Sequence, residues 1–349
     1  MRIASAATAF PPNLYAQESI TSALRQVWGE SLRKPAALDR LHTNCGVKQR
    51  HFVGTIDQYL SLQTFGQAND LWIEAAQQLG EEAILRAAAS ADIDLASLGA
   101  IFFVSVTGIA SPSIDARLIN RMGLPSRIKR IPIFGLGCVA GAAGIARASD
   151  YVRAFPDESA LLLSVELCSL NWQRGDLSAA NLISAGLFAD GAAAVIIAGE
   201  RTSHPGVRVV ATRSTFYPDT EDAMGWNISE NGFRIVLSPE VPNIIREHLR
   251  EDVDVFLADH GLCRCDIRSY IIHTGGPKVL QAVEAALDLP AEALEASWDS
   301  LARLGNLSSA SVLCVLEEHL QNRRQPAGTY SLLAAMGPGF CSELVLLQW

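Results

Sequence analysis

Apolar and polar residues alternate along this chain in blocks that predict an α/β protein. Short, nearly uninterrupted apolar runs favour strands buried on both faces, and they occupy residues 100–106, 160–165, 192–198, 270–272 and 344–347. Longer segments carry apolar residues at the spacing of an amphipathic helix, and they occupy residues 71–89, 239–260 and 279–287. Because the two kinds of segment follow one another, we expect a sheet covered by helices.

Two long runs without charge, 95–114 and 131–146, raise the question of a membrane span, which needs about 20 predominantly apolar residues. Serine, threonine, glycine and proline break up the second half of the first run, and the second run is shorter and glycine-rich. We expect both to be buried protein and no membrane span. The apolar start before Pro11 and Pro12 is too short for a signal peptide, so a cytoplasmic protein is expected.

The chain also repeats itself. One strand ends in Thr107-Gly108 and another in Thr274-Gly275, and a small-residue helix opens after each, at Cys138 (138 − 107 = 31) and Asn306 (306 − 274 = 32). Such offsets arise by chance in a regular α/β protein, but the shared Thr-Gly and Gly-x helix starts favour duplication. The sequence thus predicts halves 1–200 and 201–349, related by a pseudo-twofold axis that would bring Cys138 and Asn306 to one site.

Composition narrows the class of protein. Of 349 residues, 49% are hydrophobic and 19% charged, which excludes a disordered or fibrous chain. The 28 Lys and Arg against 37 Asp and Glu give a net charge of −9, which argues against a broad nucleic-acid-binding surface. A small anionic substrate stays compatible with this charge, because a local cluster of cations can hold phosphates.

The seven cysteines lie at positions 45, 138, 168, 263, 265, 314 and 341. Without an export signal, we expect reduced thiols. Cys263 and Cys265 have no second ligand pair nearby, so no zinc site is predicted.

Cys138 has the most suggestive surroundings. The segment GLGCVAG (135–141) places a thiol where a glycine-rich turn enters a helix. Free backbone N–H groups and the positive end of the helix dipole would favour the thiolate there. Since an ordinary thiol, with a pKa of about 8.5, is only slightly ionised at neutral pH, a lower pKa would enrich the nucleophile. Cys138 is therefore a candidate nucleophile; the alternative is an inert core cysteine.

Two further polar residues stand beside glycines at element ends. His273 begins His-Thr-Gly-Gly-Pro after a predicted strand, where strand ends open into clefts, although a lone histidine is more often structural. Asn306 opens a helix in GNLSSAS (305–311), where asparagine also serves as an ordinary N-cap.

In this order, these segments resemble the chalcone synthase-like type III polyketide synthases of the thiolase superfamily. The resemblance covers almost the whole chain and rests on GLGCVAGAAG (135–144), LFADGAAAV (187–195), IIHTGGPK (271–278), GNLSSASVL (305–313) and MGPGFCSELVLLQW (336–349). It implies a five-layered αβαβα subunit, a homodimer, and CoA thioesters as substrates with no metal or bound cofactor. TEDAMGW (220–226), followed by Gly232-Phe233, looks closer to bacterial alkylpyrone and alkylresorcinol synthases than to plant enzymes.

The resemblance also implies roles for single residues. Cys138 matches the nucleophile that carries the starter and the growing chain. His273 matches the residue that supports the thiolate and, with Asn306, binds the thioester carbonyl during decarboxylation of malonyl-CoA. This agrees with the chemistry, because an enolate needs donors aimed at its oxygen and neutral Asn306 supplies one without quenching the charge.

Around these three residues the match is looser. Phe188 matches an aromatic at the neck between the CoA tunnel and the cavity, whereas Ile235 stands where the family has a second aromatic. Arg40 falls on a residue that binds CoA phosphates, but the flanking lysines are missing. Other cations near it are Arg33, Lys34 and Lys48, with a solvated basic face as the alternative. Three cavity positions differ from chalcone synthase, and they carry Cys168, Asn171 and Trp226 here. A fourth, Ser308, is retained.

These observations predict an acyltransferase that loads a fatty acyl group from acyl-CoA onto Cys138, extends it with malonyl-CoA and cyclises it to an alkylpyrone or alkylresorcinol. The alternatives are a malonyl-primed or aromatic-starter type III synthase, a ketoacyl synthase III-like enzyme that performs one condensation on acyl carrier protein, and a non-catalytic acyl-binding protein.

Overall fold

The computed structural model describes residues 1–32 and 35–349, and within them one mixed sheet dominates, with strand order β11-β12-β13-β8-β1-β7-β6-β4-β5. Its strands are β1 (Arg2–Ala9), β4 (Leu98–Val104), β5 (Lys129–Ile133), β6 (Ser159–Leu167), β7 (Asp190–Ala198), β8 (Val207–Phe216), β11 (Ile267–Ile272), β12 (Tyr330–Gly337) and β13 (Cys341–Gln348). Strands β1 and β8 pair through only two residue pairs, so the sheet consists of two wings joined near the N-terminus.

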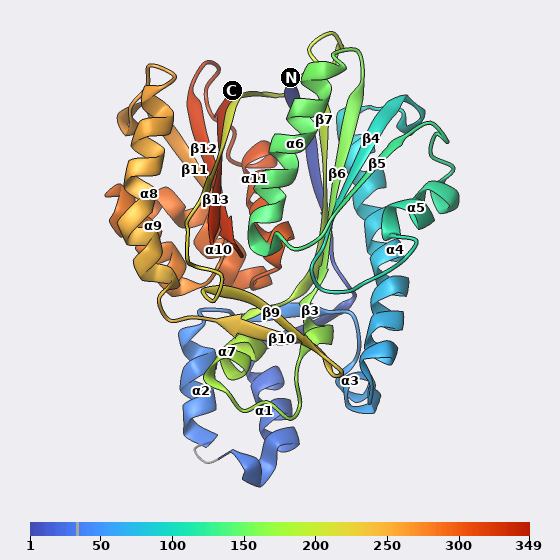
Figure 1. The fold of residues 1–349 in the computed structure, drawn as a ribbon, viewed down its shortest axis with the longest axis vertical. Coiled ribbons are helices and arrows are strands. Elements are labelled where there is room, and N and C mark those ends of the chain that lie inside the picture. The colour runs from blue at the N-terminus through green and yellow to red at the C-terminus, as the bar shows by residue number, and fades with distance from the viewer. Residues whose placement is uncertain (33–34) are drawn as a thin grey trace.

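Helices form three layers around these wings (Figure 1). Between the wings lie α6 (Ala140–Ala154) and α11 (Ser311–Gln321), whose buried residues share one core with both wings. The outer face of the β1-β7-β6-β4-β5 wing packs against α4 (Phe65–Ala91) and α5 (Ile114–Met122). The other wing packs against α8 (Val241–Ala258) and α9 (Pro277–Leu287). The expected five-layered αβαβα architecture is confirmed.

Strand pairing is repeated in the two wings. In the first wing β4 pairs with β6 in parallel, β6 with β7 antiparallel and β7 with β1 antiparallel. In the second wing the same sequence of pairings joins β11, β12, β13 and β8. Strand β5 extends the first wing beyond β4 and forms one edge of the sheet, with β11 at the other. The β4–β6 and β11–β12 pairs place Thr107 and Thr274 at corresponding ends of the two wings.

The strands read as apolar runs because both of their faces are covered. Every residue of β6 and β7 is buried, as expected for strands between helix layers. The two uncharged runs are divided between elements, 95–114 into β4 and the turn before α5, and 131–146 into β5, a turn and α6. Among the described residues, no helix has the length and hydropathy needed to cross a membrane.

A smaller group of elements lies below the sheet in Figure 1 and encloses the end where the candidate residues lie. It comprises β2 (Asn13–Ala16), α1 (Gln17–Trp28), α2 (Pro35–Asn44), β3 (Gln49–Phe52), α3 (Ile56–Ser61), α7 (Ala179–Leu187), β9 (Met224–Ser229) and β10 (Gly232–Leu237). The remaining helix, α10 (Glu295–Leu304), leads into Asn306.

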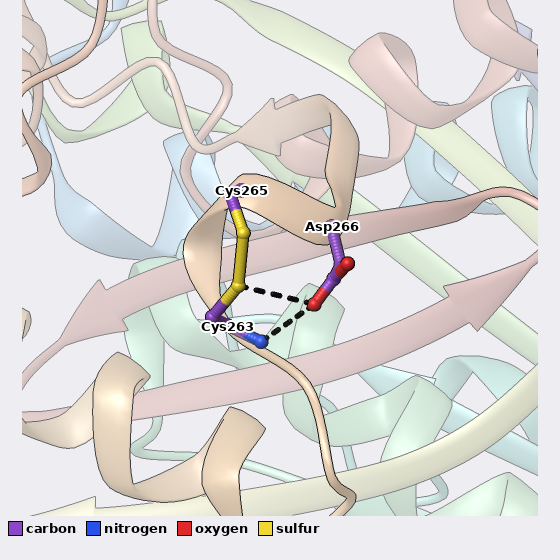
Figure 2. Close-up of side chains that lie close together, drawn as sticks. All are labelled: Cys263, Cys265 and Asp266. Carbon is purple, nitrogen blue, oxygen red and sulfur yellow. Dashed lines mark hydrogen bonds between the residues drawn. A yellow bond between two sulfur atoms is a disulfide. The ribbon is translucent and has the colours of Figure 1, made fainter.

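One expectation about the cysteines is wrong. Cys263 and Cys265 are joined by a disulfide in the turn before β11 (Figure 2), whereas we expected reduced thiols throughout. Their Cα atoms lie 5.3 Å apart, within the usual range for a disulfide, because the turn brings both side chains to the same side. The cysteines at positions 45, 138, 168, 314 and 341 are free.

Candidate active site

Cys138 lies in the short 3-10 turn η3 (Gly137–Val139), directly before α6. Gly137 has φ of +53°, and a Cβ there would lie 2.7 Å from Pro338 Cδ, so this turn requires glycine. Gly141 allows the first turn of α6 to approach the turn that follows Asn306, since its Cβ would lie 2.3 Å from the Ser309 carbonyl oxygen. Glycines thus bring the helix start of one half against that of the other.

His273 follows the last residue of β11 and is 4% exposed. Its backbone N–H donates to the Ala334 carbonyl at 3.0 Å, which continues the β11–β12 ladder and fixes the base of the side chain. Its ring Nδ1 is buried and has no hydrogen-bond partner among the described residues. Burial lowers the pKa of His273 to about 4, so its imidazole is neutral at pH 7.

Asn306 is held by backbone hydrogen bonds on both sides. Its N–H donates to the Leu187 carbonyl and its carbonyl accepts from the Ala189 N–H, both at 2.9 Å, in a bridge across Phe188. Its side-chain Oδ1 accepts from the Ser308 N–H at 2.8 Å. Because Oδ1 is engaged by the backbone, the Nδ2 group is the part of the amide left to donate to a substrate.

The three candidate residues line one cavity, which we call the inner cavity; it has about 560 Å³ of empty space, part of it open to solvent. Its other walls are almost entirely apolar and come from α8, α9, β12 and the loop that carries Phe188. Cys138 donates to the Ser308 hydroxyl at 3.7 Å, so Ser308 also lies at this site. Segments more than 130 residues apart in the sequence therefore meet around one apolar space, as the pseudo-twofold argument predicted.

The protonation state of Cys138 differs from our expectation. Burial raises the pKa of the Cys138 thiol to about 12, and the nearby Glu166 carboxylate adds to this effect, whereas the Ser308 hydrogen bond opposes it. The expected stabilisation of a thiolate by the helix start is therefore outweighed by loss of solvent. Thiol and neutral imidazole are the resting forms, and a nucleophilic thiolate requires transfer of the Cys138 proton to a base.

A second cavity, the outer cavity, begins on the other side of Phe188. It has about 800 Å³ of empty space, part of it open to solvent, and Phe188 lines both cavities. Besides Phe188, the outer cavity includes four more of the predicted substrate-binding residues, which are Cys168, Asn171, Trp226 and Ile235. Trp226 and Ile235 are paired residues on β9 and β10, so the unusual aromatic and the unusual aliphatic residue form one patch of wall. The predicted position of Phe188 at a neck is thus consistent with the geometry.

Of the predicted CoA-phosphate residues, Arg40 and Lys48 are not brought to either cavity. Arg40 is exposed on α2 and is not among the described residues that line the inner or the outer cavity. Lys48 is also exposed, and Arg33 and Lys34 lie outside the described residues.

Comparison with known proteins decides what this arrangement is. The model of the N-terminal domain of chalcone and stilbene synthases matches residues 2–201, and that of the C-terminal domain matches residues 208–349. This chain belongs to the chalcone and stilbene synthase family. It is a type III polyketide synthase, an acyltransferase that forms carbon–carbon bonds by decarboxylative condensation of CoA thioesters and uses no resident cofactor. The non-catalytic alternative is thereby set aside.

Relatives of this polyketide synthase include enzymes with different products. The 1,3,6,8-tetrahydroxynaphthalene synthase of Streptomyces peucetius subsp. caesius is 49% identical over 99% of this chain and 93% of its own length. The alpha-pyrone synthesis polyketide synthase-like Pks18 of Mycobacterium tuberculosis is 33% identical over 80% of this chain and 72% of its own. The solved 1,3,6,8-tetrahydroxynaphthalene synthase of Streptomyces coelicolor A3(2) has a TM-score of 0.95 and 32% identity, with 100% and 99% of the two chains covered.

Two buried ionisable residues of this synthase were missed by the sequence analysis. Glu166, on β6, accepts hydrogen bonds from the Thr107 hydroxyl at 2.9 Å, the Val106 N–H at 3.1 Å and the Ser309 hydroxyl. Burial raises the pKa of its carboxyl. The signal available was a single acidic residue in the otherwise uncharged strand SALLLSVEL (159–167).

The other missed residue is Arg50, which is 1% exposed and lines the outer cavity. Its Nη1 donates to the Phe188 carbonyl at 2.6 Å and its Nε to Gln17 Oε1 at 3.1 Å. Burial lowers the pKa of Arg50 to about 10, so it stays charged at pH 7. Arg50 thus supports the backbone at the neck, and no local pattern distinguishes it from a surface arginine.

Proposed function

We propose that this synthase is primed by malonyl-CoA and builds a pentaketide that closes to a tetrahydroxynaphthalene. The observation that carries this proposal is the 49% identity, over 99% of the chain, to a protein named for that product. A naphthalene skeleton has ten carbons, which five two-carbon units from malonyl-CoA supply without any other starter. The fatty acyl starter expected from the sequence remains the second candidate, discussed below.

The inner cavity supplies the chemistry. The Cys138 thiol passes its proton to the neutral His273 imidazole and attacks the starter thioester, and the CoA thiolate that leaves takes this proton from His273. His273 and Asn306 then donate to the thioester oxygen of a second malonyl-CoA, whose decarboxylation produces an enolate. This enolate attacks the acyl group on Cys138, and the extended chain returns to the sulfur for the next round. Donors placed in advance around the developing oxyanion are what accelerate the decarboxylation.

The outer cavity would hold the growing chain. One wall carries hydroxyl and amide groups, on Tyr59, Ser169, Asn171 and Ser184. A poly-β-keto chain has a carbonyl at every second carbon, and buried carbonyls need hydrogen-bond donors. Ser169 and Ser184 donate to Asp190 Oδ2 and to the Asn181 carbonyl, so the donor left for a chain carbonyl is the second N–H of the Asn171 amide, whose first donates to the Thr107 carbonyl.

Another part of the lining supports the second candidate, an acyl-CoA-primed synthase that forms an alkylpyrone or alkylresorcinol. It is apolar and consists of Ile20, Ala23, Leu24 and Val27 of α1, with Trp226 and Ile235 facing the same space. An alkyl tail would gain about 0.8 kcal/mol for each methylene buried there.

Product analysis separates the two candidates. We would incubate the purified enzyme with malonyl-CoA alone and with malonyl-CoA plus acyl-CoAs of increasing length, and identify the products by mass spectrometry. The first candidate predicts a ten-carbon aromatic product from malonyl-CoA alone, at a rate that added acyl-CoA does not raise. Acyl-containing pyrones or resorcinols as the main products, with little product from malonyl-CoA alone, would establish the second. Products extended only once would contradict both.

We also propose that the enzyme is a cytoplasmic homodimer of subunits built from halves 1–200 and 201–349. The edge strand β5 leaves backbone groups unpaired on its outer side, which templates association with another chain. Phe134, which follows β5, is 54% exposed and Ile109 is 46% exposed, so apolar surface accompanies this edge. Light scattering of the wild type and of Phe134→Asp tests the assembly: the wild type should be dimeric, and an unaltered dimer in the variant would contradict this interface.

A further inference from the structure

Cys263 and Cys265 form a site that the polyketide chemistry does not use. They flank Arg264 in the 3-10 turn η5 (Arg264–Asp266), both are exposed, and their sulfurs are bonded to each other (Figure 2). Strand β11 begins at Ile267 and reaches His273 at its far end, so the pair lies about 20 Å from the inner cavity at the ordinary rise of a strand. The site is therefore separate from the catalytic residues.

A structural crosslink explains this pair poorly. A disulfide stabilises a fold chiefly by closing a loop in the unfolded chain, and the effect is smallest for the shortest loops. The cysteines are two residues apart, and the turn is already closed by hydrogen bonds from the Cys263 N–H to Asp266 Oδ2 and from the Asp266 N–H to the Cys263 carbonyl. Exposed disulfides are also the ones that thiols reach and reduce most readily.

We propose that Cys263 and Cys265 form a surface dithiol–disulfide site that exchanges with anionic low-molecular-weight thiols and their disulfides. The thiolate of one such molecule attacks one sulfur, forms a mixed disulfide and expels the other cysteine as a thiolate, which takes a proton from water. A second thiolate attacks the small-molecule sulfur of this mixed disulfide, forms the small-molecule disulfide and releases the protein cysteine as a thiolate, which also takes a proton from water. Two electrons thus pass from two thiols to the protein disulfide, and the products are one small-molecule disulfide and the protein dithiol. The reverse reaction regenerates the bond.

One exposed cation beside the disulfide can contact an anionic partner, although Asp288 and Glu292 also line the cavity next to it. Cys265 lines a broad surface cavity together with Arg264 and Arg268. Arg264 is paired with Asp254 and Asp288, whereas Arg268 is exposed and has no ion-pair partner among the described residues. Arg268 is thus a cation available to an incoming carboxylate beside the disulfide.

Asp266 opposes the charged form of the dithiol. Its Oδ2 lies 3.1 Å from Cys263 Sγ, so a thiolate at Cys263 would face a carboxylate. Two charges about 4 Å apart in a water-like medium repel by about 1 kcal/mol, or about fivefold in population. Asp266→Asn removes this repulsion, so more of the Cys263 thiol is ionised at pH 7. Because a thiolate that forms more easily is also less nucleophilic, part of this gain is lost, and reoxidation of the dithiol should be about two- to fivefold faster.

The test uses the full-length enzyme in buffers of increasing ratio of reduced to oxidised glutathione. Acid quenching, alkylation and peptide mass mapping then report the state of Cys263 and Cys265. We expect the peptide to change from disulfide to doubly alkylated within the series, and Cys263→Ser to trap glutathione on Cys265. We also expect Cys263→Ser/Cys265→Ser to decarboxylate malonyl-CoA at the wild-type rate, which shows that the variant is folded.

Three results would overturn the proposal. Two free thiols at every ratio, including oxidised glutathione alone, would mean that the disulfide does not form. A disulfide that persists in excess reduced glutathione would make it a structural crosslink. A zinc ion bound to the reduced protein in native mass spectrometry, and lost in the double variant, would make the cluster of Cys263, Cys265 and Asp266 a metal site. None of these results bears on the polyketide chemistry.

Discussion

The inner and outer cavities share Phe188 but are built in different ways. The inner cavity is fixed by backbone: Cys138 by a glycine turn before α6, Asn306 by the bridge across Phe188, and His273 by the end of the β11–β12 ladder. The outer cavity is lined by side chains from α1, α3, α7, β9 and β10. We infer that the inner cavity carries out the same condensation reaction whatever the substrate, and that the outer cavity determines which starter and chain length the enzyme uses.

The largest effect is expected when the proposed nucleophile of the inner cavity is removed. Cys138→Ala should abolish chain extension, because no other described thiol lines the inner cavity. Decarboxylation of malonyl-CoA should persist, since it uses His273 and Asn306. Product formation and release of carbon dioxide are measured side by side. Cys168→Ala, which changes a thiol of the outer cavity, is the matched control and should keep extension active. Equal loss in both variants would break the distinction between the cavities.

A smaller effect is expected from the oxyanion donor. Removing one preorganised donor typically costs about 100- to 1000-fold in rate. Asn306→Ala should therefore decarboxylate malonyl-CoA about 100- to 1000-fold more slowly, while Cys138 still accepts an acyl group from acyl-CoA. The measurements are carbon dioxide release and the mass of the acylated enzyme. Wild-type decarboxylation in this variant would remove Asn306 from the mechanism.

A substitution in the outer cavity should change which starter the enzyme prefers but not the rate at which it decarboxylates malonyl-CoA. Trp226→Ala enlarges the space beyond Phe188, so longer acyl-CoA starters should improve by at most about fourfold in kcat/KM for each methylene newly buried. Trp226→Phe is the control for the loss of volume, and decarboxylation of malonyl-CoA should be the same in both variants. An unchanged length profile in Trp226→Ala would mean that this wall does not contact the chain.

The smallest expected effect concerns pH. Burial lowers the pKa of His273 to about 4, so the neutral ring predominates above that pH and is lost only as the pH falls towards 4. In the Cys138→Ala variant, which lacks the thiol, decarboxylation should change by less than about twofold between about pH 6 and about pH 8. A titration centred near the ordinary histidine pKa of about 6.5 would show instead that water reaches the ring.

The features that could be predicted from the sequence are those that local sequence determines, as it does for the residues of the inner cavity. The strands of the central layers were found because burial on both faces leaves an apolar run, as in β6 and β7. Cys138, His273 and Asn306 could be singled out as candidates because each stands beside glycines at an element end, where local sequence sets local geometry. Strand β1 (RIASAATA) was missed, since its alanines and serines are small and its burial comes from β7 and α4.

Other features depend on contacts that no local pattern records. Arg50 and Glu166 owe their burial to residues more than 30 positions away in the chain. The protonation of Cys138 was misjudged because the helix start is visible in the sequence and the loss of solvent is not. The extent of the cavity beyond Phe188 is likewise set by how α1 and the β9–β10 hairpin pack.

The most direct test of the central claim is to trap the acyl-enzyme. The wild-type enzyme is mixed with a starter CoA thioester, quenched in acid within one turnover, digested and mapped by mass spectrometry. The account predicts a thioester on the peptide that contains Cys138, and none on those that contain Cys168 or Cys341. An acyl group found on either of those cysteines, with Cys138 unmodified, would contradict the assignment of the inner cavity as the site of reaction.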